Sequence, residues 1–333
     1  MTRRFRLALV ALGAVLAACG GQNMRPSPVV PDAGATVART SWMRPSAAKA
    51  ANLLYVSNAR DVSVYSYKDG GGIQQVGDLT GFVSPKSLCA DKAGNVWVAD
   101  YGARAMVEYA HGGTSPIKTI EHHTSGFPDA CAVDPASNDL AVSWQHPNAK
   151  FEVYADVYIY PNERGPGKIY NRDGGFFSSI YFLTYDATGK LFADASPCYD
   201  SGCYYSGGPP GLFVLAPRSN EFAQLPINGA TLYEPSAVVW VNPTLLLVDR
   251  NFENGESSGA YKLLATKVRA AVVGTLSLTG AGQVYGLTVR AGLAIAPDAS
   301  TSTVRIYRIS DDTLVSSFTQ GLDSPYAAVV SQK

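Results

Sequence analysis

Charged side chains and methionine are both scarce in this chain. Asp, Glu, Lys and Arg make up 16% of the 333 residues, Met occurs four times, and 46% of the residues are hydrophobic. A chain with so few charged residues and so many hydrophobic ones is not a disordered tail. It has no long amphipathic period of helical type, which argues against alternating β/α folds. It also has no Cys-x-x-Cys, so neither a redox motif nor a zinc site is indicated.

The chain also has no excess of basic residues over acidic ones. The chain carries 27 basic and 27 acidic side chains. Without the three arginines of residues 1–18, 24 basic side chains face 27 acidic ones, a net charge of −3. Because nucleic-acid binding needs a basic surface, the composition argues against a nucleic-acid partner.

The first 18 residues have the composition of an export signal. Three arginines precede the apolar run Leu7–Leu16, which is too short for a membrane span. The sequence Leu16-Ala17-Ala18-Cys19 resembles the cleavage box of bacterial lipoproteins. That resemblance implies removal of residues 1–18, acylation of Cys19 with fatty acids such as palmitate, and membrane attachment through this lipid alone. Because Gly20 rather than Asp follows the cysteine, it also implies the outer membrane, at the cell surface or the periplasmic face.

Three regions follow from composition. Residues 1–18 are the signal peptide. Residues 19–48 hold the lipidated cysteine and a stretch with four prolines and no apolar period, which is typical of a flexible tether. Residues 49–333 carry regular β patterns and are predicted to form one domain.

Short apolar segments that read as strands recur through this domain. They recur at intervals of 42 to 54 residues, close to the length of a four-stranded propeller blade. We interpret each as the second, returning strand of a blade. The segments are Leu54-Tyr55-Val56, Val96-Trp97-Val98, Leu140-Ala141-Val142, Leu191-Phe192-Ala193, Leu245-Leu246-Leu247 and Leu293-Ala294-Ile295.

The two ends of the domain complement each other. The first repeat lacks an opening strand before Leu54, while Ser324–Val330 reads as an opening strand with nothing after it. A ring closed by pairing these ends leaves no open sheet edge between them. We therefore predict an all-β fold, a six-bladed β-propeller with four-stranded blades, closed by the C-terminal strand.

The hairpin motifs carry a family resemblance. Asp91–Asp100, with Gly94-Asn95 at its turn, Pro128–Asp134 and Tyr185–Phe192 resemble repeats of the NHL-type six-bladed β-propellers of exported bacterial lipoproteins. The resemblance covers roughly residues 51–331 and concerns architecture far more than activity.

Four cysteines remain after Cys19, an even number that favours disulfides in an exported protein. Cys198 and Cys203 flank a short Gly-containing turn, which predicts a local bridge. Cys89 and Cys131 occupy matching strands of neighbouring repeats, so they form either a bridge between blades or two buried thiols.

Three consecutive repeats have long loops after the returning strand, and together these loops predict a wall on one face. Their aromatic, amide and charged side chains suit a sugar, a peptide or a protein surface. The alternative is surface decoration. The predicted ligand face consists of Trp144, His146, Tyr199, Tyr204, Tyr205, Asp249, Arg250, Asn251 and Glu253.

A second candidate site lies where the opening strands begin, near the mouth of the channel. The residues predicted there are Lys86, Asp129, Glu234, Tyr285 and Tyr326. In lactonase-type propellers, oxygen ligands at this place hold a divalent cation such as calcium. Asp129, Glu234, Asp249 and Asn58 could imitate that set, or they could be solvated channel charges.

The sequence favours a lipid-anchored, non-catalytic propeller that binds a protein, peptide or glycan of the cell envelope. We expect it to act as a monomer without a cofactor. The alternative is a metal-dependent lactonase-like hydrolase or lyase working at the channel mouth. A structural envelope component without a small ligand is a third interpretation, and no residue spacing decides between them.

Overall fold

The computed structural model describes residues 40–68, 71–121, 126–147, 153–172, 175–198, 203, 208–255 and 257–333. Within them the chain forms β-strands and three short 3-10 helices, η1 (Ala47–Lys49), η2 (Pro161–Glu163) and η3 (Phe252–Asn254). None of the helices in the described part of the chain has the length and apolar character needed to cross a membrane.

The first sheet joins the beginning and the end of the described chain. Its strand order is β1-β4-β3-β2-β26. Its strands are β1 (Trp42–Met43), β2 (Asn52–Ser57), β3 (Val62–Lys68), β4 (Gly71–Leu79) and β26 (Ala327–Gln332). The second sheet is an antiparallel meander of β5 (Pro85–Ala90), β6 (Val96–Asp100), β7 (Ala105–Tyr109) and β8 (Pro116–Glu121).

The third sheet has eight strands in the order β12-β16-β15-β14-β13-β11-β10-β9. It contains two consecutive groups of four strands. The first group is β9 (Phe127–Val133), β10 (Leu140–Pro147), β11 (Val153–Tyr160) and β12 (Lys168–Arg172). The second group is β13 (Phe177–Tyr185), β14 (Leu191–Pro197), β15 (Gly211–Leu215) and β16 (Glu221–Leu225).

Two further sheets complete the arrangement. One has the order β17-β21-β20-β19-β18, with β17 (Ile227–Asn228), β18 (Pro235–Val241), β19 (Thr244–Asp249), β20 (Gly259–Ala265) and β21 (Ala270–Ser277). The other is β22 (Thr288–Arg290), β23 (Leu293–Asp298), β24 (Thr303–Arg308) and β25 (Leu314–Phe318).

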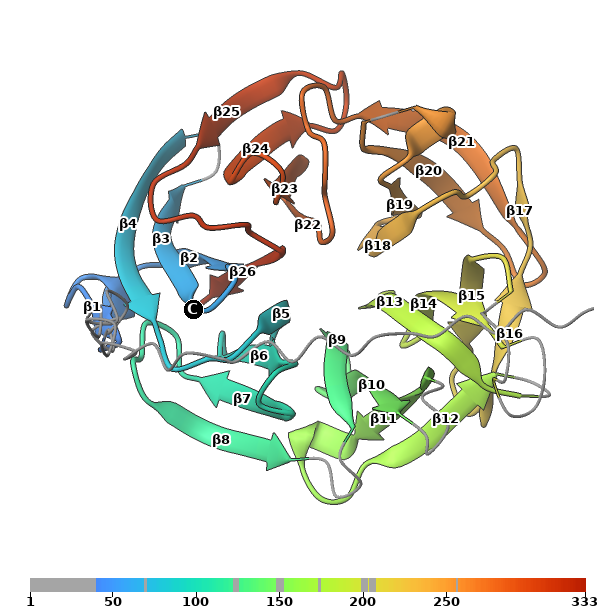
Figure 1. Ribbon diagram of the computed structural model, residues 1–333, viewed down its shortest axis with the longest axis horizontal. Coiled ribbons are helices and arrows are strands. Elements are labelled where there is room, and N and C mark those ends of the chain that lie inside the picture. Colours follow the sequence, from blue (N-terminus) through green and yellow to red (C-terminus); the bar gives the residue numbers. More distant parts are fainter. Residues whose placement is uncertain are drawn as a thin grey trace, which may run out of the picture. The chain divides into compact units, whose positions relative to one another are not determined.

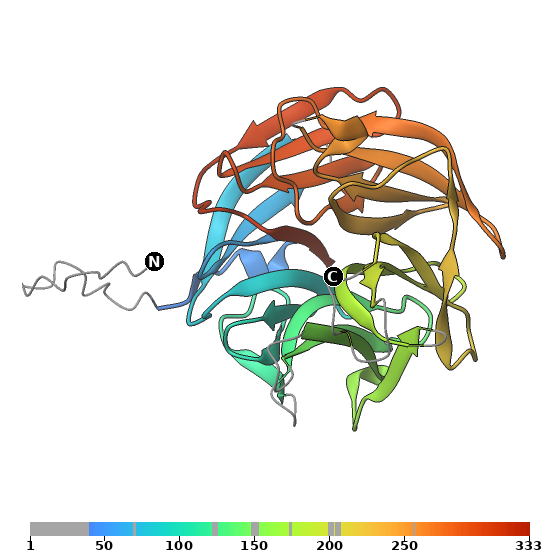
Figure 2. The ribbon, with the colours of Figure 1, turned by 45° about the vertical axis from the view of Figure 1, so that its right-hand side comes forward.

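These sheets stand around a common axis as in a propeller (Figure 1). The strands β26, β5, β9, β13, β18 and β22 lie nearest the axis, and β4, β8, β12, β21 and β25 lie at the outside. The oblique view in Figure 2 shows the sheets fanning around the same axis. All six predicted returning strands are present, as β2, β6, β10, β14, β19 and β23, so the predicted repeat is confirmed.

Closure through the C-terminal strand is also confirmed. β26 pairs antiparallel with β2, from Asn52 opposite Gln332 to Ser57 opposite Ala327. Backbone bonds continue beyond the strand, since the Tyr326 N–H donates to the Ser57 carbonyl at 2.8 Å. The first sheet therefore contains both ends of the repeat region.

The prediction of six separate four-stranded sheets is confirmed only in part, because the described strands form five hydrogen-bonded sheets. The groups β9–β12 and β13–β16 are bridged by a single Cα pair, Ala155 with Phe177, and by a short parallel pairing of β12 with β16. The all-β, propeller-like architecture itself is clear.

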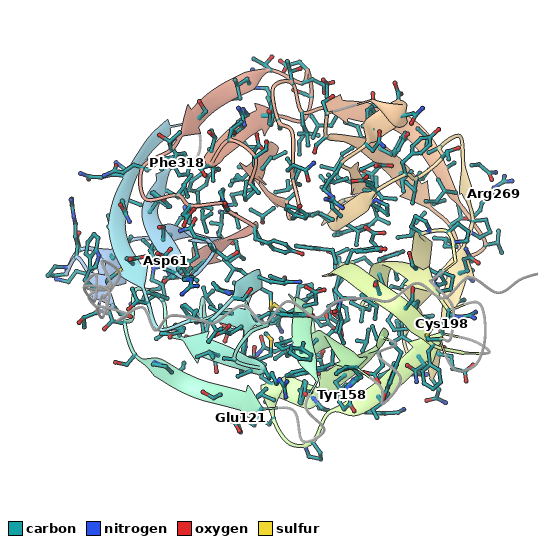
Figure 3. The ribbon with its side chains drawn as sticks, in the orientation of Figure 1. Asp61, Glu121, Tyr158, Cys198, Arg269 and Phe318 are labelled. Atoms are coloured by element: carbon teal, nitrogen blue, oxygen red, sulfur yellow. A yellow bond between two sulfur atoms is a disulfide. The ribbon has the colours of Figure 1, made fainter. Side chains whose placement is uncertain are left out.

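Turn chemistry explains why the hairpins form where they do. At the turn between β5 and β6, the Asn95 N–H donates to Asp91 Oδ1 at 2.7 Å, and Gly94 has a φ of +83°. Glycine adopts this conformation without the strain that a Cβ causes. Side chains fill the spaces between the strand groups (Figure 3), and the buried ones form apolar clusters there. Fully buried Trp97, Trp144 and Tyr307 are among the largest of them.

The folded region begins earlier than residue 49. Trp42 and Met43 form β1, which pairs with Asp78 and Gly77 of β4. The last residues of the predicted tether thus add an edge strand to the first sheet. Gly77 leaves room for the end of the Met43 side chain, which a Cβ at residue 77 would force to move.

Candidate functional site at the channel mouth

The five residues predicted at the channel mouth all lie at the same end of the inner strands. Lys86 and Asp129 lie near the starts of β5 and β9. Glu234, Tyr285 and Tyr326 precede β18, β22 and β26. Loops that enter neighbouring inner strands therefore bring together residues far apart in the sequence.

Lys86 is the centre of one half of this mouth. Its Nζ lies 2.8 Å from Asp129 Oδ1, 4.1 Å from the centroid of the Tyr101 ring and 5.5 Å from that of Tyr326. The other Asp129 oxygen accepts a hydrogen bond from Gln145 Nε2 at 2.8 Å. The half-buried ammonium group is thus held by one carboxylate and two aromatic rings.

Arg250 is the centre of the other half. Its guanidinium carbon lies 4.5 Å from the centroid of the Tyr285 ring, and its Nη2 lies 3.5 Å from Glu234 Oε2. Tyr285 in turn stacks on Tyr326, with ring centroids 5.0 Å apart and planes inclined by 7°. This stack connects the two halves, so all five predicted mouth residues belong to one continuous chain of contacts.

The structure adds residues that the sequence analysis missed. Tyr101 stacks on Phe127, with ring centroids 4.9 Å apart. The guanidinium carbon of Arg104 lies 4.4 Å from the centroid of the same Phe127 ring. Tyr101 and Arg250 each directly follow the last residue of a returning strand, Asp100 or Asp249. That shared position was a usable sequence pattern. We call the set Lys86, Tyr101, Arg104, Phe127, Asp129, Glu234, Arg250, Tyr285 and Tyr326 the mouth cluster.

Burial shifts two acids of the mouth cluster toward their neutral forms. It raises the pKa of Asp129, and the Lys86 ammonium group opposes that rise. Burial also raises the pKa of the Tyr326 hydroxyl well above its usual value, and the nearby Asp129 charge adds to the effect. The Tyr326 hydroxyl is therefore neutral, and the Lys86 ammonium group favours the ionised form of Asp129.

Aspartates at the ends of returning strands shape the loops around the mouth. Asp249 accepts backbone N–H bonds from Tyr233, Glu234 and Asn251 at 2.8 to 3.0 Å. Asp100 and Asp298 do the same for the loops that enter β5 and β22. Asp249 is fully buried, so its prediction as a ligand-face residue was wrong. Its carboxylate holds the loop that presents Arg250 and Glu234.

The four candidate cation ligands do not converge. Asp129 binds Lys86, Glu234 pairs with Arg250, and Asp249 is saturated by backbone donors. Asn58 belongs to another loop, where its Nδ2 donates to Asp61 and Ser63. In the described residues, the one group of three acidic side chains close enough to share a metal ion lies elsewhere. These contacts favour the alternative left open by the sequence, in which the four residues are channel and loop groups paired with their neighbours.

Two residues of the predicted ligand face belong to the interior. Trp144 is 0% exposed and packs in the hydrophobic cluster between β5–β8 and β9–β12. His146 is buried, 3.0 Å from Asp156 Oδ1 and stacked on Tyr154. Both lie in β10, because the hairpin β10–β11 extends through residues that were assigned to a loop. Their prediction as ligand-face residues was wrong.

The remaining ligand-face predictions fall into two groups. Tyr199, Tyr204 and Tyr205 lie outside the described residues. Asn251 and Glu253 lie at η3, where Glu253 is exposed with a φ of +53°. Among the predicted ligand-face residues that the structure describes, Arg250 is the one that is also a member of the mouth cluster.

Both predicted cysteine pairs form disulfides. Cys198 is joined to Cys203, and Cys89 of β5 is joined to Cys131 of β9. The second bridge resolves the alternative that the sequence left open, and it links the inner strands of two consecutive strand groups. Two disulfides are typical of a protein that folds in an oxidising compartment.

Asp194 is the most isolated acid of the described structure. It lies on β14, fully buried, and neither carboxylate oxygen has a hydrogen-bond partner among the described residues. Burial raises its pKa well above the usual value, and the charge of Asp249 raises it further. Burial thus favours the neutral form of the Asp194 carboxyl group.

Comparisons with known proteins concern the fold. Neither a protein-family model nor a curated protein matches the sequence. Among solved structures, a chain of a nidogen/laminin complex, a β-propeller, has a TM-score of 0.63 at 13% identity, over 84% of this chain and 98% of that one. A protein of unknown function from Bacteroides caccae has a TM-score of 0.56 at 12% identity, over 85% and 99%. These similarities support a propeller fold.

Proposed function

We propose that this chain is a non-catalytic, protein-binding β-propeller of the cell envelope, and that the mouth cluster is its binding surface. The main support is the continuous chain of half-exposed rings and cations that runs from Arg104 to Glu234. Tyrosine and arginine are the residue types most enriched among those that dominate protein interfaces. Their side chains are already held by mutual contacts, so little ordering is needed on binding.

The charges of the mouth cluster suggest the kind of partner. Asp129 is buried against Lys86, while Glu234 is exposed and pairs with Arg250. With Arg104 exposed and Lys86 and Arg250 half-exposed, three accessible cations face one accessible carboxylate. Accessible positive charge beside aromatic rings favours an acidic segment that also carries apolar or aromatic side chains. A peptide or glycan of that chemistry would use the same surface. A neighbour of the same fold was crystallised in a complex named nidogen/laminin, which is consistent with a protein partner.

The enzyme alternative has no specific observation in its favour. A lactonase-like reaction at the mouth would need convergent oxygen ligands, and the candidate carboxylates there are paired with cations or backbone donors.

The binding role is tested with the variant Arg250→Ala/Tyr285→Ala. Loss of this stacked cation and ring should reduce capture of envelope proteins at least tenfold, since hot-spot residues typically cost 2 kcal/mol or more. The measurement is quantitative mass spectrometry of proteins captured from the envelope of the source bacterium, with circular dichroism to verify folding. Arg269→Ala on the exposed outer part of the β20–β21 hairpin is the matched control. Unchanged capture by the folded double variant would count against the proposal.

We also propose that the ring has six blades. In this interpretation the eight-stranded sheet is two neighbouring blades, β9–β12 and β13–β16. The support is the slight bridging between them, one Cα pair and one short parallel pairing, compared with the long antiparallel pairings inside each group.

Attachment through a lipid at Cys19 completes the proposal, on the basis of the lipoprotein-type sequence before that residue. The outer membrane or cell surface is the proposed location. A Cys19→Ser chain should move from the membrane fraction to the soluble fraction, because one acyl-bearing residue is the whole anchor in this proposal. Fractionation followed by immunoblotting measures this shift, and persistent membrane binding would contradict acylation.

A further inference from the structure

Three carboxylates from two neighbouring strand groups meet at the other end of the strands. Asp91 follows β5, Glu108 lies in β7, and Glu163 ends η2 after β11. One oxygen from each lies within 4.8 Å of the others. Lys86 lies at the start of β5 and Asp91 just after its end, so this site is separate from the mouth cluster.

Glu163 is the residue that makes this group unusual. Its side chain is only 7% exposed, and Oε1 has no hydrogen-bond partner in the described structure. Its φ of +58° follows one of +45° at Asn162, values that are costly for residues other than glycine. The backbone thus places a buried acid, one of whose oxygens has no hydrogen-bond partner in the described structure, close to two others.

The neighbours orient the carboxylates without neutralising them. Asn95 Nδ2 donates to Asp91 Oδ2 at 2.9 Å and to Glu108 Oε1 at 3.0 Å. None of the three acids forms an ion pair with a described basic residue. The Lys118 ammonium group lowers the pKa of both glutamates, and its Nζ lies 5.2 Å from the centroid of the Trp97 ring. One ammonium group cannot balance three carboxylates.

The pKa values of two of the three acids, Glu108 and Glu163, are raised. Burial, followed by the charge of Asp91, raises the pKa of Glu163 to about 7, and the Trp97 N–H and Lys118 oppose that rise. Burial and Asp91 also raise the pKa of Glu108. A positive ion among these oxygens would offset both the cost of burying the carboxylates and their mutual repulsion.

We propose that Asp91, Glu108 and Glu163 form a binding site for a divalent oxygen-seeking cation, and that calcium is the cation. Carboxylate oxygens are the ligands that Ca²⁺ takes, at about 2.3–2.6 Å. Oxygens bound to one Ca²⁺ at those distances lie no more than about 5 Å apart, and the observed spacing satisfies this. A bound ion would connect β5–β8 to the segment after β11, as the Cys89–Cys131 bridge does at the inner strands.

The full mature chain tests the site directly, with Tb³⁺ as a luminescent substitute for Ca²⁺ and with Ca²⁺ itself. Tb³⁺ next to the Trp97 indole should show emission when tryptophan is excited, and Ca²⁺ at millimolar concentration should displace it. Glu163→Gln, which keeps the shape of the side chain, should weaken Tb³⁺ binding at least tenfold. Glu221→Gln, an exposed acid on β16, is the matched control and should bind as the unmodified chain does.

Thermal unfolding gives a second readout. Addition of Ca²⁺ should raise the Tm of the unmodified chain and of Glu221→Gln, because an ion that binds only the folded state stabilises it. The same addition should leave the Tm of Glu163→Gln unchanged. Absence of Ca²⁺ binding by the folded unmodified chain would overturn the proposal, and so would equal binding by Glu163→Gln. Neither result bears on capture of partners by the mouth cluster.

Discussion

Removal of residues 324–333 is expected to abolish cooperative unfolding of the propeller. β2 would lose the neighbour with which it pairs from Asn52 to Ser57. Its fully buried residues Leu54 and Val56 would then face water along an unpaired strand edge, and such edges lead to aggregation. The expected result is a chain without a sharp thermal transition in circular dichroism, largely aggregated in gel filtration.

β26 also holds parts of the ring beyond its own sheet. Ser331 Oγ lies 2.6 Å from His111 Nδ1 and donates to the carbonyl of Gly94. Burial lowers the pKa of His111, so the neutral imidazole is favoured in this contact. β26 thereby joins the first sheet to the turns of β5–β8. Removal of β26 should therefore destabilise both strand groups.

Addition of a peptide with the sequence of residues 324–333 provides the decisive control. If pairing with β2 is the cause, the peptide should restore the sharp transition, whereas a scrambled peptide should not. Removal of Lys333 alone should have little effect, because that exposed residue contributes a single backbone bond to Ala51 and a bond from its side chain to Ala48. A cooperative, monomeric fold without residues 324–333 would mean that closure is dispensable.

Closure and the proposed binding surface depend on the same segment. Tyr326 immediately precedes β26, and its ring connects Lys86 to Tyr285. A chain that fails to close therefore also divides the mouth cluster into two halves. Stability and binding should be lost together in this truncation, but separately in Arg250→Ala/Tyr285→Ala.

The repeat pattern was predictable because it depends on local chemistry. An apolar run, a turn containing Gly or Asn and a second apolar run specify a hairpin wherever they occur. The six returning strands and the closing strand were found in this way. The bridging of β9–β12 with β13–β16 was not, since it depends on how two hairpins approach each other.

The site was predicted less well, and Trp144 and Asp249 show why. An aromatic or acidic residue near the end of a strand has the same sequence pattern whether it points inward or outward. Trp144 points into the interior because β10 is longer than its apolar run suggests. The Asp249 carboxylate points inward, where it accepts hydrogen bonds from three backbone N–H groups. The positions of Lys86 and Tyr326 were predictable because a propeller places every start of an inner strand around the same opening.

Trp144→Ala is expected to lower the free energy of unfolding by about 3–5 kcal/mol, the usual cost of replacing a buried tryptophan by alanine. Its side chain is fully buried with Trp97, Met106 and Tyr160 in the cluster between two strand groups. A typical domain has a total stability of about 5–15 kcal/mol, so this loss is a large part of it. Urea unfolding followed by circular dichroism measures the change.

Trp42→Ala is the matched control, because Trp42 is 43% exposed on the edge strand β1. Its replacement should shift the urea midpoint far less than Trp144→Ala. Equal shifts would mean that Trp144 does not support the interface between the strand groups. A ligand-face residue would behave in the opposite way, since its replacement would reduce binding at nearly unchanged stability. The comparison of the two variants therefore measures how much the buried Trp144 side chain stabilises the ring.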